Sequence, residues 1–219
     1  MQIKRPDSLS KIAEEHIRQG IVGGTFGLGE PLQEAKLSTA TGMSKTPIRE
    51  ALSALKLQGL VQIIPQRGAF VFTLSKEDVE QLCRFRLILE TAAIDQALDE
   101  NPAALLAELV LIVEKMGRAR EAGAFDEYLE LDADFHDAFF KHCGNSYLRE
   151  GYQKVSDIVR TMRTHLSKRP ERTVKSFNEH EAITAYLNEG KTSAAKKVLK
   201  RQITRGERSY SDLIGVEQV

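Results

Sequence analysis

The sequence predicts a mainly α-helical protein in two domains, residues 1–74 and 75–219. The first observation is periodicity, because apolar residues recur at intervals of three and four along most of the 219-residue chain. The second is that a single stretch, residues 60–73, has the β-branched runs typical of strands. The third is charge: residues 1–74 carry nine basic and six acidic residues, net +3, whereas residues 75–219 carry 22 and 25, net −3.

The composition narrows the class of protein. Hydrophobic residues make up 42% and charged residues 28% of the chain, which are ordinary values for a folded globular protein. No apolar run approaches the roughly 18 residues of a membrane-spanning helix, and residues 1–6 lack the apolar core of a secretory signal. Two cysteines, Cys83 and Cys143, are too few for a disulfide framework, so we expect a cytoplasmic protein without a membrane partner.

Three helices are expected in the first domain. Residues 8–22 have an amphipathic pattern that begins at one of two serine caps and ends at a pair of glycines. Residues 34–41 predict a short second helix that Gly42 stops. The third helix follows Ser44 as its N-cap, directs its apolar residues inward and ends at Gly59.

A β-hairpin is predicted after the third helix. Residues 60–64 and 69–73 are two β-branched runs, and the turn between them contains Pro65 and Gly68, with Arg67 at its tip. A helix, a short helix, a turn, a helix and a hairpin follow one another in a winged helix-turn-helix. The first domain is therefore predicted to be a winged helix-turn-helix of three helices plus a β-hairpin.

The polar face of the third helix is typical of a helix that binds DNA. It carries hydroxyl and basic side chains, and such a helix fits the major groove with its N-terminal side chains at the base edges. Hydroxyl groups can bind phosphates, and a basic residue at the hairpin tip can enter the minor groove. The candidate DNA-binding residues are Ser44, Lys45, Thr46, Arg49, Arg67 and Gly68. The alternative is a small helical domain with a solvated polar face.

Four motifs in this region resemble the DNA-binding domain of GntR-family bacterial transcription regulators. They are residues 31–37 (PLQEAKL), 42–52 (GMSKTPIREAL), 59–61 (GLV) and 67–71 (RGAFV). The resemblance implies a repressor or related regulator that binds a palindromic operator in double-stranded DNA as a homodimer. Two positions depart from the family. Lys45 stands where arginine is usual, which keeps the charge but loses the two-pronged donor, and Ala35 stands where some members have a DNA-contacting arginine.

The second domain is predicted to be an all-α antiparallel helical bundle. Its helical segments are separated by glycine, proline and asparagine breaks, and the links between them are short. The expected helices cover residues 76–99, 103–122, 125–143, 146–167, 172–189 and 192–211.

Six polar residues lie within the apolar stripes of these predicted helices. They are Arg86, Glu90, Asp132, His136, His180 and Gln202. Burying an ionisable group is unfavourable by several kcal/mol unless the group is paired or ligated, so a cluster of this kind favours a binding site. The alternative is a set of structural hydrogen bonds in the core.

The residue types in this cluster suit a metal ion and an acid. Asp132 and His136 are four residues apart on one helical face and could bind one metal ion, with His180 as a third ligand. Two histidines and a carboxylate suit a divalent transition metal, namely zinc, nickel, manganese or iron. Arg86 could hold the carboxylate of a small acid through a two-pronged hydrogen bond.

The same residues resemble the ligand-binding domain, called FCD, of the FadR-type branch of the GntR family. The resemblance rests on residues 86–90 (RLILE), 132–136 (DADFH), 144–145 (GN) and 179–180 (EH). It implies a divalent metal held by an aspartate, the histidine four residues on and two later histidines, and a small organic acid sensed there. Gln202 stands at the fourth ligand position, so the metal could be held weakly, held by three residues and water, or absent.

The resemblance also indicates which residues would meet the effector. Arg86, Glu90 and Gln202 are candidates, and His165 on a neighbouring helix could line the pocket or lie at the surface. Basic residues on the last helix are expected to form a solvated outer face rather than a second DNA site. They are Lys196, Lys197, Lys200, Arg201, Arg205 and Arg208.

The sequence thus predicts a bacterial transcription regulator, not an enzyme, in which a small carboxylate effector changes the spacing of two DNA-reading heads. The helix at residues 76–99 follows the hairpin directly, so we expect it to transmit the effect of effector binding to the DNA-binding domain. Two alternatives remain open. One is a metal-dependent hydrolase fused to a DNA-binding head, although no separate general base stands out. The other is an effector-blind DNA-binding dimer with a degenerate metal site, which Gln202 favours.

Overall fold

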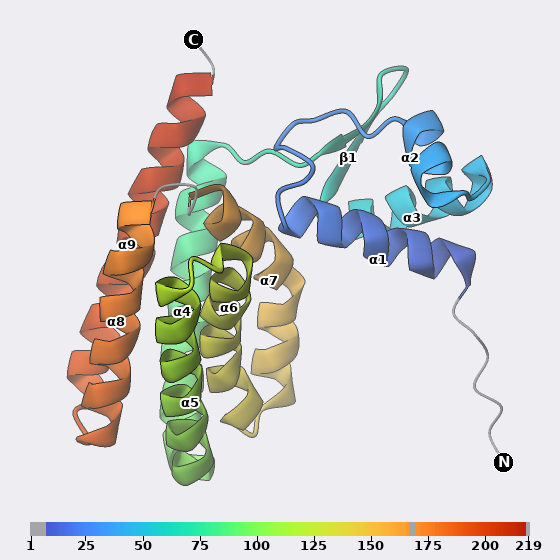
Figure 1. Ribbon diagram of the computed structural model, residues 1–219. Coiled ribbons are helices and arrows are strands. Elements are labelled where there is room, and N and C mark those ends of the chain that lie inside the picture. Colours follow the sequence, from blue (N-terminus) through green and yellow to red (C-terminus); the bar gives the residue numbers. More distant parts are fainter. Residues whose placement is uncertain (1–7, 167–169, 218–219) are drawn as a thin grey trace, which may run out of the picture. The chain divides into compact units, whose positions relative to one another are not determined.

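The computed structural model describes residues 8–166 and 170–217 (Figure 1). The chain divides into two compact units, Met1–Thr73 and Leu74–Val219, and each is described by itself. Residues 1–6, on which the expectation about a secretory signal rests, lie outside the described residues, as does residue 167 at the end of one predicted helix. Within the described ranges, no helix combines the length and the apolar character that crossing a bilayer requires.

The first unit contains three helices and a two-stranded antiparallel sheet, as the sequence predicts. The helices are α1 (Leu9–Val22), α2 (Glu34–Thr41) and α3 (Lys45–Leu57), and the strands are β1 (Val61–Ile64) and β2 (Gly68–Val71). Helix α1 packs against α3, and α2 also packs against α3. Their apolar faces form the core of the unit, in which Ile17, Ile21, Ile48 and Leu55 have no exposed surface. The fold is that of a winged helix-turn-helix.

Local capping determines where these helices begin and end. The Ser8 side chain accepts a hydrogen bond from the backbone N–H of Lys11, which caps α1. Gly42 ends α2 in the left-handed conformation, with φ at 68°, which a glycine adopts without steric cost. Ser44 occupies the N-cap position of α3 with extended backbone, but its side chain makes no capping hydrogen bond. The Ser44 hydroxyl is therefore left available to another partner.

The hairpin forms the wing of this unit. Strands β1 and β2 pair in register from Val61 with Val71 to Ile64 with Gly68. The turn between them holds Gln66 at a positive φ of 62°, a conformation that a type II turn requires and that residues other than glycine and asparagine rarely adopt. Arg67 lies at the exposed end of this turn.

The second unit is an all-α bundle, as predicted. Its helices within the described residues are α4 (Lys76–Glu100), α5 (Pro102–Glu121), α6 (Phe125–His142), α7 (Ser146–Leu166), α8 (Pro170–Asn188) and α9 (Thr192–Glu217). Helix α9 continues to Glu217 rather than ending near residue 211, because each added residue contributes one more hydrogen bond once a helix is formed. Ser75 and Asp78 form the capping box that begins α4.

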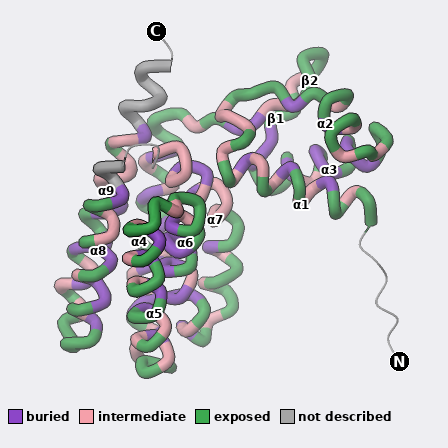
Figure 2. Tube along the Cα trace, in the orientation of Figure 1, coloured by how far each residue is buried: buried purple, intermediate pink, exposed green. Residues whose placement is uncertain are grey.

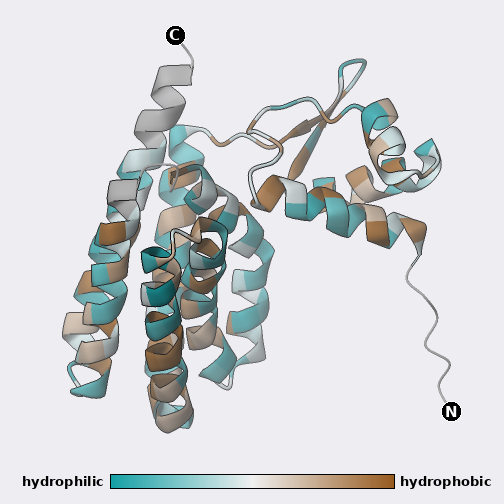
Figure 3. Ribbon diagram, in the orientation of Figure 1, coloured by the Kyte–Doolittle hydropathy of each residue, from teal (hydrophilic) through white to brown (hydrophobic). Residues whose placement is uncertain are grey.

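Packing places α4 and α6 in the interior of the bundle. Helix α4 contacts α6 and α9, α6 also contacts α5, and α8 lies between α5 and α9 (Figure 1). Figure 2 shows buried positions along these helices, and Figure 3 shows hydrophobic residues over much of α5. The aromatic rings of Phe135, Phe139 and Tyr128 on α6 are fully or almost fully buried. These rings form an apolar surface beside the buried polar residues of the bundle.

Candidate metal centre and nucleic-acid interface

All six polar residues singled out in the bundle are buried. Their exposed fractions lie between 0% and 8%, and they come from α4, α6, α8 and α9. The residues are Arg86, Glu90, Asp132, His136, His180 and Gln202. Positions far apart in the sequence are thus brought together where buried charge must be paired or ligated.

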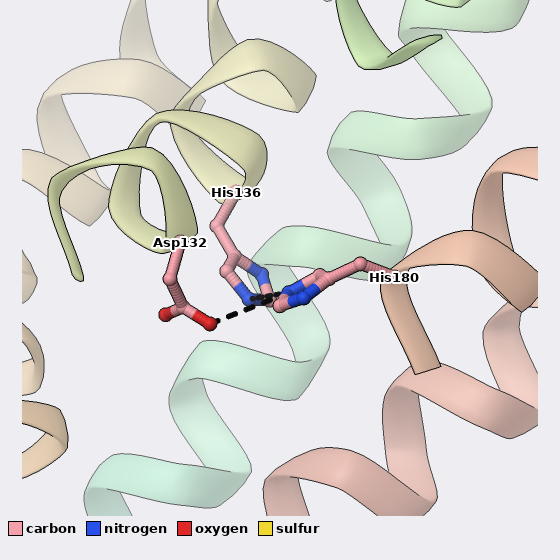
Figure 4. A group of neighbouring side chains, drawn as sticks. All are labelled: Asp132, His136 and His180. Carbon is pink, nitrogen blue, oxygen red and sulfur yellow. Dashed lines mark hydrogen bonds and ion pairs between the residues drawn. The ribbon is translucent and has the colours of Figure 1, made fainter. Parts of the chain in front are cut away.

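Asp132, His136 and His180 point toward one another (Figure 4). Asp132 and His136 lie one turn apart on α6, and His180 approaches them from α8. The Nε2 atoms of the two histidines are 3.4 Å apart, and His180 Nε2 lies 3.5 Å from Asp132 Oδ1. Atoms that bind zinc tetrahedrally at about 2.0–2.1 Å are about 3.3–3.4 Å from each other. These two separations are close to those between ligand atoms of a tetrahedral metal ion, and all three candidate atoms lie within 4.8 Å of one another.

Glu90 orients His136 for that role. The Nδ1–H group of His136 donates a hydrogen bond of 2.6 Å to Glu90 Oε2, so Nε2 keeps the lone pair that a metal requires. The other carboxylate oxygen of Glu90 accepts a hydrogen bond from Arg86 Nε. The Nη2 atom of Arg86 lies 3.2–3.3 Å from both nitrogens of His136. Glu90 thus lies behind His136 and holds both His136 and Arg86 in place.

The electrostatics keep both imidazoles neutral. Burial, followed by the charges of Arg163 and Arg86, lowers the pKa of His136 well below its usual value. Burial also lowers the pKa of His180 to about 4, although Asp132 opposes this shift. Burial would raise the pKa of Asp132, but the charge of Arg163, the largest of the opposing interactions, helps to lower the pKa to about 2. A carboxylate and two neutral imidazoles at pH 7 are the protonation states that metal ligands need.

Gln202 completes the group from α9. Its Nε2 lies 3.1 Å from His180 Nε2 and 3.4 Å from the hydroxyl of Ser176. Its Oε1 is buried and makes no hydrogen bond within the part of the chain that the structure describes. Burying an amide oxygen without a hydrogen-bond partner is energetically unfavourable. Because this oxygen lies beside two histidines and a carboxylate, a bound ligand or metal ion could supply the missing partner.

Arg163 on α7 is a residue that the helical patterns of the sequence did not single out. Its Nη1 lies 3.1 Å from Asp132 Oδ2, but neither of its terminal nitrogens has hydrogen-bond geometry with any described residue. It follows Tyr152 and Val159, both buried on α7, by eleven and four residues, which is helical spacing on one face. That spacing is the signal that could have identified it.

A small cavity of about 70 Å³ opens beside the metal-ligand candidates. Arg86, Asp132, His136, Arg163 and Gln202 line it, together with Tyr128, Leu166, Ser176, Arg205 and Gly206. Polar groups around a space of this size can hold a few water molecules or a small anionic group. Glu90 and His165 are not among the lining residues, and His165 is half-buried on α7.

The predicted DNA-binding residues lie at the surface of the first unit. Ser44, Lys45, Thr46 and Arg49 are exposed around the N-terminus of α3, whereas Pro47 and Ile48 between them are buried. The Nε of Arg49 forms an ion pair of 2.8 Å with Glu34 at the start of α2. Exposed pairs of this kind contribute little stability, so Arg49 can exchange Glu34 for a base or phosphate at small cost.

The wing adds one more positive charge. Arg67 and Gly68 are exposed, and the Arg67 guanidinium lies 5.7 Å from the centre of the Phe70 ring. A guanidinium on an aromatic face is oriented without being neutralised. The cationic side chain therefore remains available to an anionic partner.

Comparison with known proteins shows two matching families and several related regulators. Residues 9–71 match the family "bacterial regulatory proteins, gntR family", and residues 81–205 match the FCD domain. The chain is similar to the uncharacterised HTH-type transcriptional regulator YdhC of Bacillus subtilis (strain 168), with 28% identity over 182 residues, 83% of this chain and 81% of that protein. It is also similar to the gluconate operon transcriptional repressor of Bacillus licheniformis, with 26% identity over 189 residues, 84% of this chain and 76% of that protein.

A solved structure shows the same fold. A GntR transcriptional regulator from Rhodococcus sp. RHA1 superposes with a TM-score of 0.81 at 22% sequence identity, over 93% of this chain and 98% of that chain. The families and relatives named here are transcription regulators rather than enzymes, which confirms that part of the sequence prediction.

Proposed function

The chain belongs to the GntR family of bacterial regulatory proteins and carries an FCD domain, and we propose that it is an effector-responsive repressor. In this proposal it binds a palindromic operator as a homodimer through α3 and the wing, and it senses a small carboxylate in the bundle cavity. The observation that carries the proposal is the buried Asp132, His136 and His180 group, which opens onto a cavity lined by arginines.

The three ligand candidates fit a divalent transition metal. Asp132, His136 and His180 would hold the ion, and Gln202 would contribute its amide or leave room for water. Such an ion supplies a Lewis acid that binds an oxygen of a carboxylate. Glu90 fixes the tautomer of His136, and Arg163 keeps Asp132 ionised, so both act on the ligands from outside.

Arg163 would receive the effector's carboxylate. Arg86 also lines the cavity, but Glu90 accepts a hydrogen bond from its guanidinium, whereas Arg163 pairs with Asp132 through Nη1 without hydrogen-bond geometry and keeps Nη2 for another partner. Two parallel N–H groups bind a carboxylate in a geometry that lysine does not provide. The Bacillus licheniformis relative is named for the operon of gluconate, which is a carboxylate, and this supports an acid as the effector.

Helix α4 would transmit the response. It carries Arg86 and Glu90, and it begins at Lys76, a few residues after the wing. A ligand that binds one arrangement of the bundle better than another shifts the population toward that arrangement. A coupling free energy of about 1–3 kcal/mol changes operator affinity about 5- to 150-fold.

Arg163→Gln is expected to abolish the effector response while operator binding stays intact. Duplexes selected from a random pool by the wild-type protein serve as the operator, and fluorescence anisotropy measures release by a panel of small acids. The variant removes both carboxylate donors but no residue of the DNA-binding unit, so the acid that releases the wild type should no longer act.

The control for this experiment is the metal content of the variant. If Arg163→Gln binds as much metal as the wild type and still responds to the same acid, the assigned role of Arg163 is wrong. Arg86→Ala leaves a buried carboxylate, Glu90, without its arginine, as Arg163→Gln does with Asp132, and it is also expected to lose the response. We therefore expect it to be destabilised by about 3–5 kcal/mol.

The homodimer is expected to involve the exposed apolar face of α4. Phe85 and Ile88 are 41% and 65% exposed and lie three residues apart on this helix. Ile88→Asp should convert a dimer to monomers in light scattering coupled to gel filtration, because it places a charge in the apolar interface. Leu111→Asp on α5, where the leucine is 47% exposed, is the matched control and should remain dimeric. An unchanged mass for Ile88→Asp would contradict this surface.

One observation favours the alternative of an effector-blind dimer. The amide nitrogen of Gln202 lies 3.1 Å from His180 Nε2 and can donate a hydrogen bond to it without any metal. In that case the buried polar group stabilises the bundle only through its own hydrogen bonds. Metal analysis of His180→Ala and Gln202→His distinguishes the two functions.

A further inference from the structure

A basic groove lies outside the effector cavity, on α9 and the adjoining part of α8. Its volume is about 530 Å³. Six of its lining side chains are basic: Lys175, Lys197, Lys200, Arg201, Arg205 and Arg208. The hydroxyl residues Thr204 and Ser209 complete the lining, and among the side chains that the structure describes none in this lining is acidic. Most of these α9 cations are exposed, as the sequence pattern predicts, and the structure gathers five of the α9 cations in one concavity.

The positive charge of this groove is only partly compensated. Arg205 pairs with the buried carboxylate of Glu179, and Arg201 Nε lies 3.7 Å from the same carboxylate. For the other four cations the described residues provide no ion pair. One face of α9 carries Lys197, Lys200 and Arg208, and the eleven helical steps from the first to the last correspond to about 16 Å. Like charges at this spacing repel one another, and an anion in the groove would relieve the repulsion.

The groove has the size and the donors of a small-ligand site. Pockets for small molecules measure roughly 300–1,000 Å³, and this groove lies within that range. Arginine binds phosphate oxygens through two N–H groups, lysine binds them as a point charge, and hydroxyl groups add further donors. A duplex would instead meet basic residues spread over a broad surface. The lining therefore suits a compact ligand with several negative charges.

We propose that this groove is a second anion site, which binds a small ligand carrying a phosphate or pyrophosphate group. Lys197, Lys200 and Arg208 bind the phosphate oxygens, and Lys175 closes the groove from α8. Arg205 lines both the groove and the effector cavity, so a phosphate here competes with Glu179 for its guanidinium. The site does not depend on the metal, because none of the metal-ligand candidates lines it.

The test is isothermal titration of the full-length protein with inorganic pyrophosphate at fixed, low ionic strength. We expect binding to the wild type and at least about tenfold weaker binding to Lys197→Gln/Lys200→Gln, because each charge-assisted hydrogen bond to phosphate is worth about that factor. The matched control is Lys115→Gln/Lys154→Gln, which removes two exposed lysines from α5 and α7 of the same unit. This control should bind pyrophosphate like the wild type.

Three outcomes would overturn the proposal. The first is that the wild type does not bind pyrophosphate. The second is that both double variants bind pyrophosphate equally weakly. The third is that Lys197→Gln/Lys200→Gln binds a random-sequence duplex more weakly than the control variant does, while the two variants bind pyrophosphate with the same affinity. The second outcome would indicate nonspecific charge attraction, and the third would indicate a nucleic-acid surface. Metal content and selected-operator binding, measured on the same variants, report separately on the proposed regulator function.

Discussion

Arg49→Ala is expected to abolish operator binding. Arg49 is exposed one turn into α3, and Glu34 holds it by a surface ion pair that contributes little stability. Removing an arginine that binds a base costs about 1–3 kcal/mol, and the proposed homodimer would lose this free energy in both half-sites. The combined cost of about 2–6 kcal/mol weakens binding at least about 30-fold in an anisotropy titration.

Lys11→Ala is the matched control for this variant. Lys11 is an exposed lysine on α1 of the same unit, so its removal changes the charge of the unit equally. We expect it to leave operator affinity within about threefold of the wild type, apart from a small effect of salt. Equal reductions in affinity for Arg49→Ala and Lys11→Ala would mean that net charge, and not a side chain of α3 at the base edges, determines affinity.

His180→Ala is expected to abolish metal binding, and Gln202→His is expected to increase the affinity for the metal. His180 has no exposed surface and its Nε2 lies within 3.5 Å of both other ligand candidates, so its removal leaves two ligands. Because even changes outside the ligand set cost about 10- to 100-fold in metal affinity, the reduction should be at least about 100-fold. Gln202→His replaces an amide with an imidazole and should raise affinity at least about tenfold.

Competition with a coloured chelator and elemental analysis measure both changes. His142→Ala is the control, because His142 on α6 contacts Glu108 and lies outside the candidate site. It should bind metal like the wild type. His180→Ala also creates a cavity and is destabilised by a few kcal/mol, so circular dichroism must first show that it is folded. Wild-type protein that binds no metal, together with a Gln202→His variant that binds none, would favour the effector-blind dimer.

Most elements of the fold could be predicted because their causes are local. The helical period, the Ser75 cap with Asp78 and the left-handed Gly42 depend on residues within a few positions of each other. The wing was predictable for the same reason, since Pro65 and Gly68 lie between two β-branched runs. The end of α9 was not predictable, because helix propagation there requires no apolar stripe.

The candidate site could be predicted only in part. Helical spacing alone placed Asp132 and His136 on one buried face, and a single turn separates them whatever surrounds α6. The contribution of Arg163 was missed because an arginine near the end of a polar helix is usually solvated. The position of Glu90, buried behind His136 rather than in the cavity, also depended on how α4 packs against α6.

The amino-acid sequence thus determined the types of element and the family, and it suggested candidate residues for binding DNA and a metal. Three features required the folded molecule: which of the buried polar groups meet, which of them hold one another in place, and that five basic residues of α9 share a groove with Lys175. The difference lies in the range of the interactions. Periodicity and caps act over a turn of backbone, whereas the approach of His180 to Asp132 across 48 positions depends on the packing of two helices.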